Sequence, residues 1–91
     1  MNALVTGGTK GIGFSIAEAM AVAGWRVMIT GRDAGRVEQA VAVLVKSVAP
    51  GGQVAGVVAD VRDRQASEAA IDEAAARFGS LDTLINNAGV G

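Results

Sequence analysis

Short apolar runs alternate along this chain with longer segments whose apolar residues recur every three or four positions. The first run, Ala3-Leu4-Val5, is typical of a buried strand. The segment after it predicts a helix over residues 12–23, which Gly24 is expected to end. We expect four residues of this helix to face a sheet, namely Ile12, Ile16, Met20 and Ala23.

The middle of the chain repeats this pattern. Residues 25–30 predict a strand whose centre, Val27-Met28-Ile29, is an unbroken apolar run, which suits a parallel strand that is covered on both faces. Asp33 is a suitable N-cap for a second helix over residues 34–48, and Pro50-Gly51-Gly52 ends that helix. The apolar face predicted for the second helix consists of Val37, Val41, Leu44 and Val48.

A third unit of the same kind completes the chain. Residues 53–59 predict a strand and residues 81–85 predict another. Between them, Asp63 is the expected N-cap of a third helix that Gly79 ends. The residues of this helix expected to face the sheet are Ile71, Ala74, Ala75 and Phe78.

Strands that alternate with helices predict an α/β fold, built of right-handed βαβ units around a parallel sheet. We expect one Rossmann-like, doubly wound domain over residues 1–91, with three helices and four strands in the order 3-2-1-4. Such sheets bind ligands beyond the carboxyl ends of their strands. The loops expected at that edge are residues 7–13, 31–33, 60–61 and 86–89.

The sequence Thr6-Gly7-Gly8-Thr9-Lys10-Gly11-Ile12-Gly13 joins the first strand to the first helix. Gly7 allows a backbone conformation that a Cβ would penalise, Gly11 allows close approach of a pyrophosphate, and Gly13 allows the helix to pack on the sheet. The helix N-terminus offers unpaired N–H groups and about half a positive charge to an anion. The spacing is neither G-x-G-x-x-G nor a P-loop. We predict phosphate binding here; a glycine-rich turn without a ligand is the alternative.

Composition narrows the choice of partners. The net charge of −1 gives no reason to expect binding to nucleic acid or to a membrane surface. The chain has no cysteine and no histidine, which excludes disulfides and Cys/His metal sites. Because neither a signal-peptide pattern nor a long apolar run is present, we expect a cytoplasmic protein.

The end of the second strand carries a candidate selector of the coenzyme. In NAD-binding units, an acid about 20 residues past the glycine turn binds the adenosine ribose. Gly31 instead leaves room for a 2′-phosphate, and Arg32 can bind one through charge-assisted hydrogen bonds worth about ten- to a hundredfold in affinity. Lys10 could add a second positive charge. We therefore predict NADP(H) over NAD(H); a solvated Arg32 with Asp33 as the ribose ligand is the alternative.

Two further loops offer polar groups at the same edge. Asp60 could accept a hydrogen bond from the adenine amino group while Val61 packs on the ring, or Asp60 could only cap its own loop. Asn86 and Asn87 place amide donors and acceptors at the end of the fourth strand. We expect them to contact a ligand; a simple turn is the alternative.

Together these motifs resemble the short-chain dehydrogenase/reductase family. Residues 6–13 match its T-G-x-x-x-G-I-G turn, Asp60-Val61 follows at the expected spacing, and Asn86-Asn87-Ala88-Gly89 matches its N-N-A-G motif. The resemblance covers residues 1–91. It implies an oxidoreductase that moves a hydride between a nicotinamide coenzyme and a carbonyl or alcohol carbon of a small-molecule substrate.

The resemblance also assigns coenzyme contacts. Thr6 and Asn87 are expected to be structural, tying the first and fourth strands to neighbouring backbone. Arg32 takes the coenzyme-selecting position, while Asp60 and Val61 hold adenine. The turn would line the pyrophosphate and its ribose through Gly7, Thr9, Lys10, Gly11, Ile12 and Gly13. The N-N-A-G motif would contact the adenosine ribose and the approach to nicotinamide through Asn86, Ala88 and Gly89.

The chain departs from the family after the N-N-A-G motif. The family's catalytic Ser and Tyr-x-x-x-Lys lie beyond that motif, and these 91 residues contain no tyrosine. We therefore expect no catalytic residue here, a sheet that is incomplete relative to the family, and the coenzyme-binding half of a longer, homo-oligomeric reductase. A dinucleotide-binding module without chemistry of its own, and an S-adenosylmethionine-dependent methyltransferase, are the alternatives.

Overall fold

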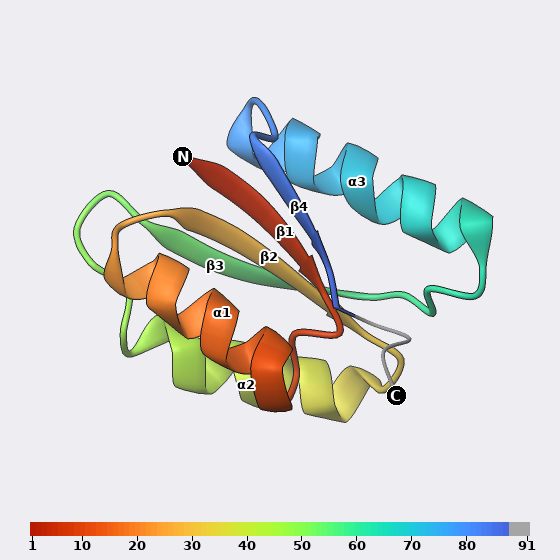
Figure 1. The fold of residues 1–91 in the computed structure, drawn as a ribbon, viewed down its shortest axis with the longest axis horizontal. Helices are drawn as coiled ribbons and strands as arrows, with labels where there is room; N and C mark the ends of the chain where they lie inside the picture. The colour runs from red at the N-terminus through yellow and green to blue at the C-terminus, as the bar shows by residue number, and fades with distance from the viewer. Residues whose placement is uncertain (88–91) are drawn as a thin grey trace.

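The computed structural model describes residues 1–87, and these form a single parallel sheet flanked by helices (Figure 1). The strands lie in the order β3-β2-β1-β4, and every pairing between them is parallel. This confirms the predicted fold class and strand order. Along the chain the elements are β1 (Asn2–Thr6), α1 (Gly11–Val22), β2 (Arg26–Gly31), α2 (Ala34–Val45), β3 (Gln53–Val58), α3 (Arg64–Phe78) and β4 (Thr83–Asn86).

The sheet is the middle of three layers. Figure 1 shows α1 and α2 on one face and α3 on the other. Along β1 and β2 the side chains alternate between the two faces, so that Val5 and Ile29 pack towards α1 and α2 while Leu4 and Met28 pack towards α3. Burial on both faces explains the unbroken apolar run of β2. Within residues 1–87, no helix combines the length and apolarity that a membrane crossing requires.

The face that α1 turns to the sheet differs from the prediction. Ile12 is 72% exposed and Ala23 is also exposed, whereas the buried residues of α1 are Gly13, Ala17 and Ala21. Each of these lies one position after an expected inward residue, which corresponds to a rotation of about 100° about the helix axis. The expectation for Ile12 and Ala23 was therefore wrong. Small side chains allow a close approach of helix and sheet, and Ile16 and Met20 pack against the core from the flank.

The predicted helix ends are largely confirmed. The Asp33 carboxylate accepts the N–H of Arg36 at 3.0 Å, and the Asp63 carboxylate accepts the N–H of Ala66 at 3.2 Å. Gly79 follows α3 in the left-handed conformation, with φ +89°. The first helix ends at Val22, one residue before the prediction, and α2 ends three residues early, at Val45; from there the chain continues to residue 48 through tighter backbone hydrogen bonds that span three residues.

Candidate functional site

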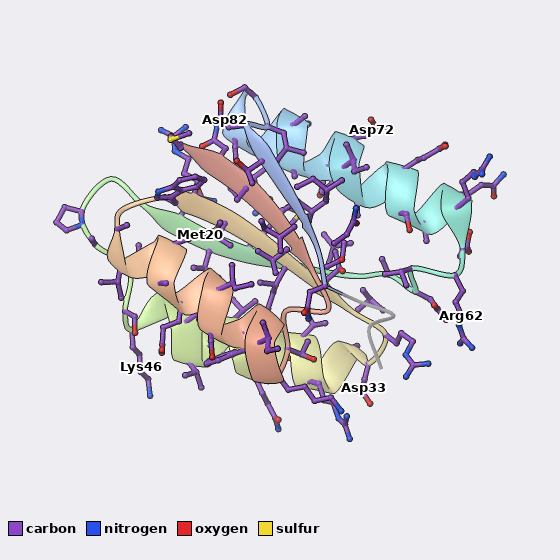
Figure 2. All side chains as sticks on the ribbon, viewed as in Figure 1. Met20, Asp33, Lys46, Arg62, Asp72 and Asp82 are labelled. Carbon is purple, nitrogen blue, oxygen red and sulfur yellow. The ribbon has the colours of Figure 1, made fainter. Side chains whose placement is uncertain are left out.

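A cleft of about 1140 Å³ opens at the carboxyl ends of β1, β2 and β3. Its walls are the glycine turn before α1, the loop between β2 and α2 and the loop between β3 and α3. Figure 2 shows Asp33 and Arg62, from two of these loops, at the same end of the molecule. The cleft brings together eight of the residues predicted to bind coenzyme: Gly7, Thr9, Lys10, Gly11, Ile12, Arg32, Asp60 and Val61.

The glycine turn has the backbone conformation that the sequence predicted for Gly7, and Gly11 adopts a similar one. Gly7 and Gly11 have φ +66° and +61°, a region that disfavours other residues. A Cβ on Gly13 would clash with the carbonyl oxygen of Gly7 and lie 2.6 Å from Nδ2 of Asn87. Gly13 is therefore buried beneath the turn and does not line the cleft; it allows α1 to begin close to the sheet.

The N-terminus of α1 is open to this cleft. Its N-cap residue, Lys10, makes no side-chain capping hydrogen bond, and the first turn holds no acidic residue. In α2 and α3, by contrast, aspartate side chains accept first-turn N–H groups. The first-turn donors of α1 thus have no carboxylate cap, which leaves the partial positive charge of the helix available to an anion.

Two residues hold the turn to the end of β4. The Thr6 hydroxyl donates to the carbonyl oxygen of Ile85 at 3.2 Å and accepts the N–H of Asn87 at 3.1 Å. The Asn87 amide donates to the carbonyl oxygen of Gly7 at 3.2 Å. These bonds confirm the structural role expected for Thr6 and Asn87.

The charges around the cleft are mostly basic. Lys10, Arg32, Arg36 and Arg62 line it, together with the carboxylates of Asp33 and Asp60. Arg62 is paired with Asp60, whereas Lys10, Arg32 and Arg36 make no ion pair with any residue in the described part of the chain. Three cations without a carboxylate partner, next to an uncapped helix, favour a ligand with more than one negative charge.

Asp60 is held by its own loop. Arg62 donates to both carboxylate oxygens through its guanidinium, at 2.7 Å for the shortest contact, and its backbone N–H donates at 2.9 Å. These hydrogen bonds, the side-chain ones first, lower the pKa of Asp60 from 3.8 to about 2. The loop-capping role considered for Asp60 is thus present, and the carboxylate that faces the cleft is ionised at neutral pH.

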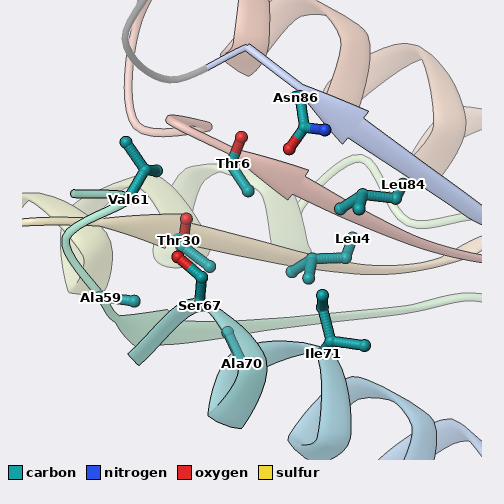
Figure 3. Close-up of a pocket in the computed structure, with 10 residues that line it drawn as sticks. All are labelled: Leu4, Thr6, Thr30, Ala59, Val61, Ser67, Ala70, Ile71, Leu84 and Asn86. Atoms are coloured by element: carbon teal, nitrogen blue, oxygen red, sulfur yellow. The ribbon is translucent and has the colours of Figure 1, made fainter. Parts of the chain in front are cut away.

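A smaller cavity, of about 110 Å³, lies between α3 and the sheet (Figure 3). Asn86 lines this cavity and not the cleft, and Val61 lines both. The hydroxyl of Thr30 also lines it and is buried without a hydrogen-bond partner among residues 1–87. Ala88 and Gly89, which were predicted to contact the coenzyme, lie outside the described residues.

The sequence analysis did not single out two arginines that line the cleft. Arg36 lies in the first turn of α2, directly after the N-cap residue Asp33. It therefore lines the same wall of the cleft as Arg32. Arg62 lies two residues after Asp60. The sequence did contain a signal for Arg36. An N-cap at residue 33 places residue 36 in the first turn of the helix, at the edge where the cleft was expected. The pairing of Arg62 depends on the conformation of a loop, which no local pattern specifies.

A sequence model of the short chain dehydrogenases matches residues 1–91. The chain belongs to the short-chain dehydrogenase family. Its relatives include the 3-oxoacyl-[acyl-carrier-protein] reductase FabG of Staphylococcus aureus, to which it is 43% identical over 89 residues; the match spans 98% of this chain and 35% of the reductase. Members of this family are oxidoreductases that bind nicotinamide dinucleotides.

Two solved short-chain dehydrogenases have the same fold. One, from Mycobacterium ulcerans, superimposes with a TM-score of 0.93 at 34% identity, covering 98% of this chain and 32% of its own. The other is an L-sorbose reductase from Gluconobacter frateurii in complex with NADPH and L-sorbose, with a TM-score of 0.88 at 34% identity, covering 98% of this chain and 33% of its own. The chain thus spans about a third of the length of these family members.

Proposed function

We propose that this chain is the coenzyme-binding half of a longer, NADP(H)-dependent short-chain oxidoreductase. The nicotinamide coenzyme would supply or accept a hydride at a carbonyl or alcohol carbon of a small molecule. The catalytic groups of the family would come from residues beyond these 91, in a cytoplasmic and homo-oligomeric protein.

The open N-terminus of α1 is the observation that carries this proposal. The first turn of α1 lines the cleft without a carboxylate cap, and a Cβ built on Gly11 would meet no neighbouring atom within 4 Å. A diphosphate needs these two features, since hydrogen-bond donors and the helix dipole stabilise its charge only at close range. Ile12, 72% exposed beside the turn, would then cover the coenzyme and not the core.

The basic residues of the cleft support NADP(H) over NAD(H). Arg32 follows Gly31 at the end of β2, and both line the cleft with Lys10. An adenosine 2′-phosphate carries about two negative charges, for which Arg32 and Lys10 offer unpaired donors. The NADPH in the complex of the L-sorbose reductase is consistent with this choice.

The remaining predicted residues would hold the adenosine. Asp60 would accept the adenine amino group at the wall of the cleft, and Val61 would pack against the ring. Gly13 would act by seating α1, and Asn86, Ala88 and Gly89 would form the approach to the ribose and the nicotinamide.

Removing the Arg32 side chain tests the coenzyme proposal. We expect Arg32→Ala to weaken the binding of NADPH by about ten- to a hundredfold and to change the binding of NADH by much less, because only NADPH carries the 2′-phosphate. Titration of both coenzymes by calorimetry or fluorescence measures the two dissociation constants. Arg77→Ala, on α3 and away from the cleft, removes the same charge as a control. Tighter binding of NADH than of NADPH by the wild type would contradict the proposal.

A dinucleotide-binding module without chemistry is the second candidate. It is favoured by the absence of tyrosine from the 91 residues, since no phenol is then available to protonate an alkoxide next to nicotinamide. Carbonyl reductase activity in the 91-residue chain would exclude this candidate and would also contradict our expectation that the catalytic groups lie elsewhere.

A further inference from the structure

Position 31, at the carboxyl end of β2, has no room for a side chain. Gly31 is buried, and a Cβ built on it would lie 2.6 Å from Cγ2 of Thr9 and 3.0 Å from Cγ2 of Val37. Gly31 is not one of the glycines with positive φ, so its backbone conformation would accept other residues. The space around it, and not its conformation, therefore requires glycine.

The two neighbours differ in their freedom to move. Val37 is 5% exposed, and its other methyl group packs over Gly56, where a Cβ would lie 2.5 Å away. Val37 is thus confined between two strands and can yield little. Thr9 lies on the partly exposed turn that lines the cleft. The Cβ of Thr9 would lie 3.7 Å from a Cβ at position 31, which is an ordinary distance. The severe contact therefore comes from the Thr9 methyl group alone.

We infer that Thr9 determines coenzyme specificity by excluding a side chain at position 31. This inference rests on the proposed function. An acid at the end of β2 is the group that would bind the ribose hydroxyls of NAD(H) and repel a 2′-phosphate. The Thr9 methyl group occupies the space of such an acid, so Arg32 follows a position that carries no carboxylate. The preference for NADP(H) thus depends on Thr9 in the glycine turn together with Gly31 at the end of β2, and changing position 31 alone does not reverse it.

The steric part of the inference is tested by thermal melting of alanine variants. We expect Gly31→Ala to lower the melting temperature by about 5 °C or more, because overpacking a close contact is destabilising. Adding Thr9→Ser, which removes the methyl group and keeps the hydroxyl, should restore the part of that loss that the Thr9 contact causes, while the contact with Val37 remains. Adding Thr9→Val, which keeps a methyl group at the same place, should restore none. A Gly31→Ala variant as stable as the wild type, or equal recovery with serine and valine, would overturn the inference.

The coenzyme part is tested by the corresponding aspartate variants. We expect Gly31→Asp with Thr9→Ser to shift the ratio of the NADH and NADPH dissociation constants towards NADH by about tenfold or more relative to Gly31→Asp with Thr9→Val. Thr9→Ser and Thr9→Val measured alone supply the references. Equal ratios in the two double variants would overturn the inference. A wild type that binds neither coenzyme would instead overturn the proposed function, while the melting series would still decide whether Thr9 controls the space at position 31.

Discussion

At the scale of single residues, Asp60 and Arg62 form the tightest charged contact at the cleft. The pair is exposed, with 75% of the Arg62 side chain and 33% of the Asp60 side chain accessible, so solvent screens its contribution to stability. The pair instead affects the orientation and the protonation of the Asp60 carboxylate. The guanidinium holds the carboxylate in one direction at the wall of the cleft and keeps it ionised far into the acidic range.

Replacing Arg62 with alanine should raise the pKa of Asp60 from about 2 towards 3.8 without reaching it, because the backbone N–H of residue 62 still donates to the carboxylate. A pH titration of the Asp60 carboxyl carbon by NMR measures this change. Arg64→Ala, two residues further on, is the control and should leave the pKa of Asp60 where it is. A pKa that stays near 2 in Arg62→Ala would contradict the assigned cause.

The same shift fixes the sign of a pH effect on folding. The pKa of Asp60 is lower in the folded chain than its ordinary value of 3.8, so the interaction stabilises the fold above that value and is lost as the pH falls to about 2. The stability difference between the wild type and Arg62→Ala should therefore shrink over this acidic interval and be constant at neutral pH. Denaturant unfolding at a series of pH values measures it.

At the scale of elements, the C-terminus of α3 is tied to the start of the sheet. The Asn2 amide donates to the carbonyl oxygens of Phe78 and Ser80, at 3.4 and 3.1 Å, and to the Ser80 hydroxyl at 3.0 Å. Arg26 donates to the Phe78 carbonyl as well, at 3.2 Å. These bonds satisfy carbonyl groups that the end of a helix leaves without partners. The first residue of β1 is therefore also a cap of α3.

We expect Asn2→Ala to lower the free energy of unfolding by about 1–3 kcal/mol, because a buried amide and its hydrogen bonds to Phe78 and Ser80 are lost, although Arg26 still donates to the Phe78 carbonyl. Asn2 is only 7% exposed, so water cannot readily replace the amide. Urea unfolding monitored by the fluorescence of Trp25 measures the change. Gln39→Ala, at an exposed position of α2, should change stability by less than about 0.5 kcal/mol. A similar small effect for Asn2→Ala would show that these bonds do not stabilise the fold.

The sequence predicted those parts of the elements that depend on local chemistry. Asp33 and Asp63 begin helices because a carboxylate satisfies first-turn N–H groups, and Gly79 ends one because it accepts a left-handed conformation. The rotation of α1 was not predictable in this way. Large apolar residues dominated its periodicity, whereas close packing against the sheet selected Ala17 and Ala21.

The candidate site likewise has a part that the sequence predicted and a part that it did not. The loops at the carboxyl edge could be named from the order of strands alone, so Arg32 and Asp60 were found. Which side chains of those loops contact one another could not. The contact between Thr9 and position 31 joins the glycine turn to the end of the neighbouring strand β2, and the pair of Asp60 and Arg62 depends on the conformation of one loop.

At the scale of the whole molecule, β4 lies at one edge of the sheet formed by residues 1–87. It pairs with β1 on one side, and its Leu84 side chain is 40% exposed. An uncharged, partly apolar edge strand can pair with another chain. This agrees with the expectation that further strands of a longer reductase cover it.

The 91-residue chain should therefore self-associate, and Leu84→Lys should reduce that association, because a charge on an edge strand opposes pairing with a second copy. Sedimentation velocity over a range of concentrations measures the effect. Val45→Lys adds the same charge on exposed α2, away from the sheet edge, and should not have it. A wild-type chain that remains monomeric at every concentration would contradict the assignment of β4 as an interacting edge.

The hydrogen bond from Asn87 to the carbonyl oxygen of Gly7 joins residues 80 positions apart. During synthesis, the turn, α1 and most of the sheet leave the ribosome well before the donor that fixes the turn. Closing so long a loop has an entropic cost that only the docked sheet repays. The signature of the turn is local in the sequence, but the turn takes its final shape only after β4 has paired with β1.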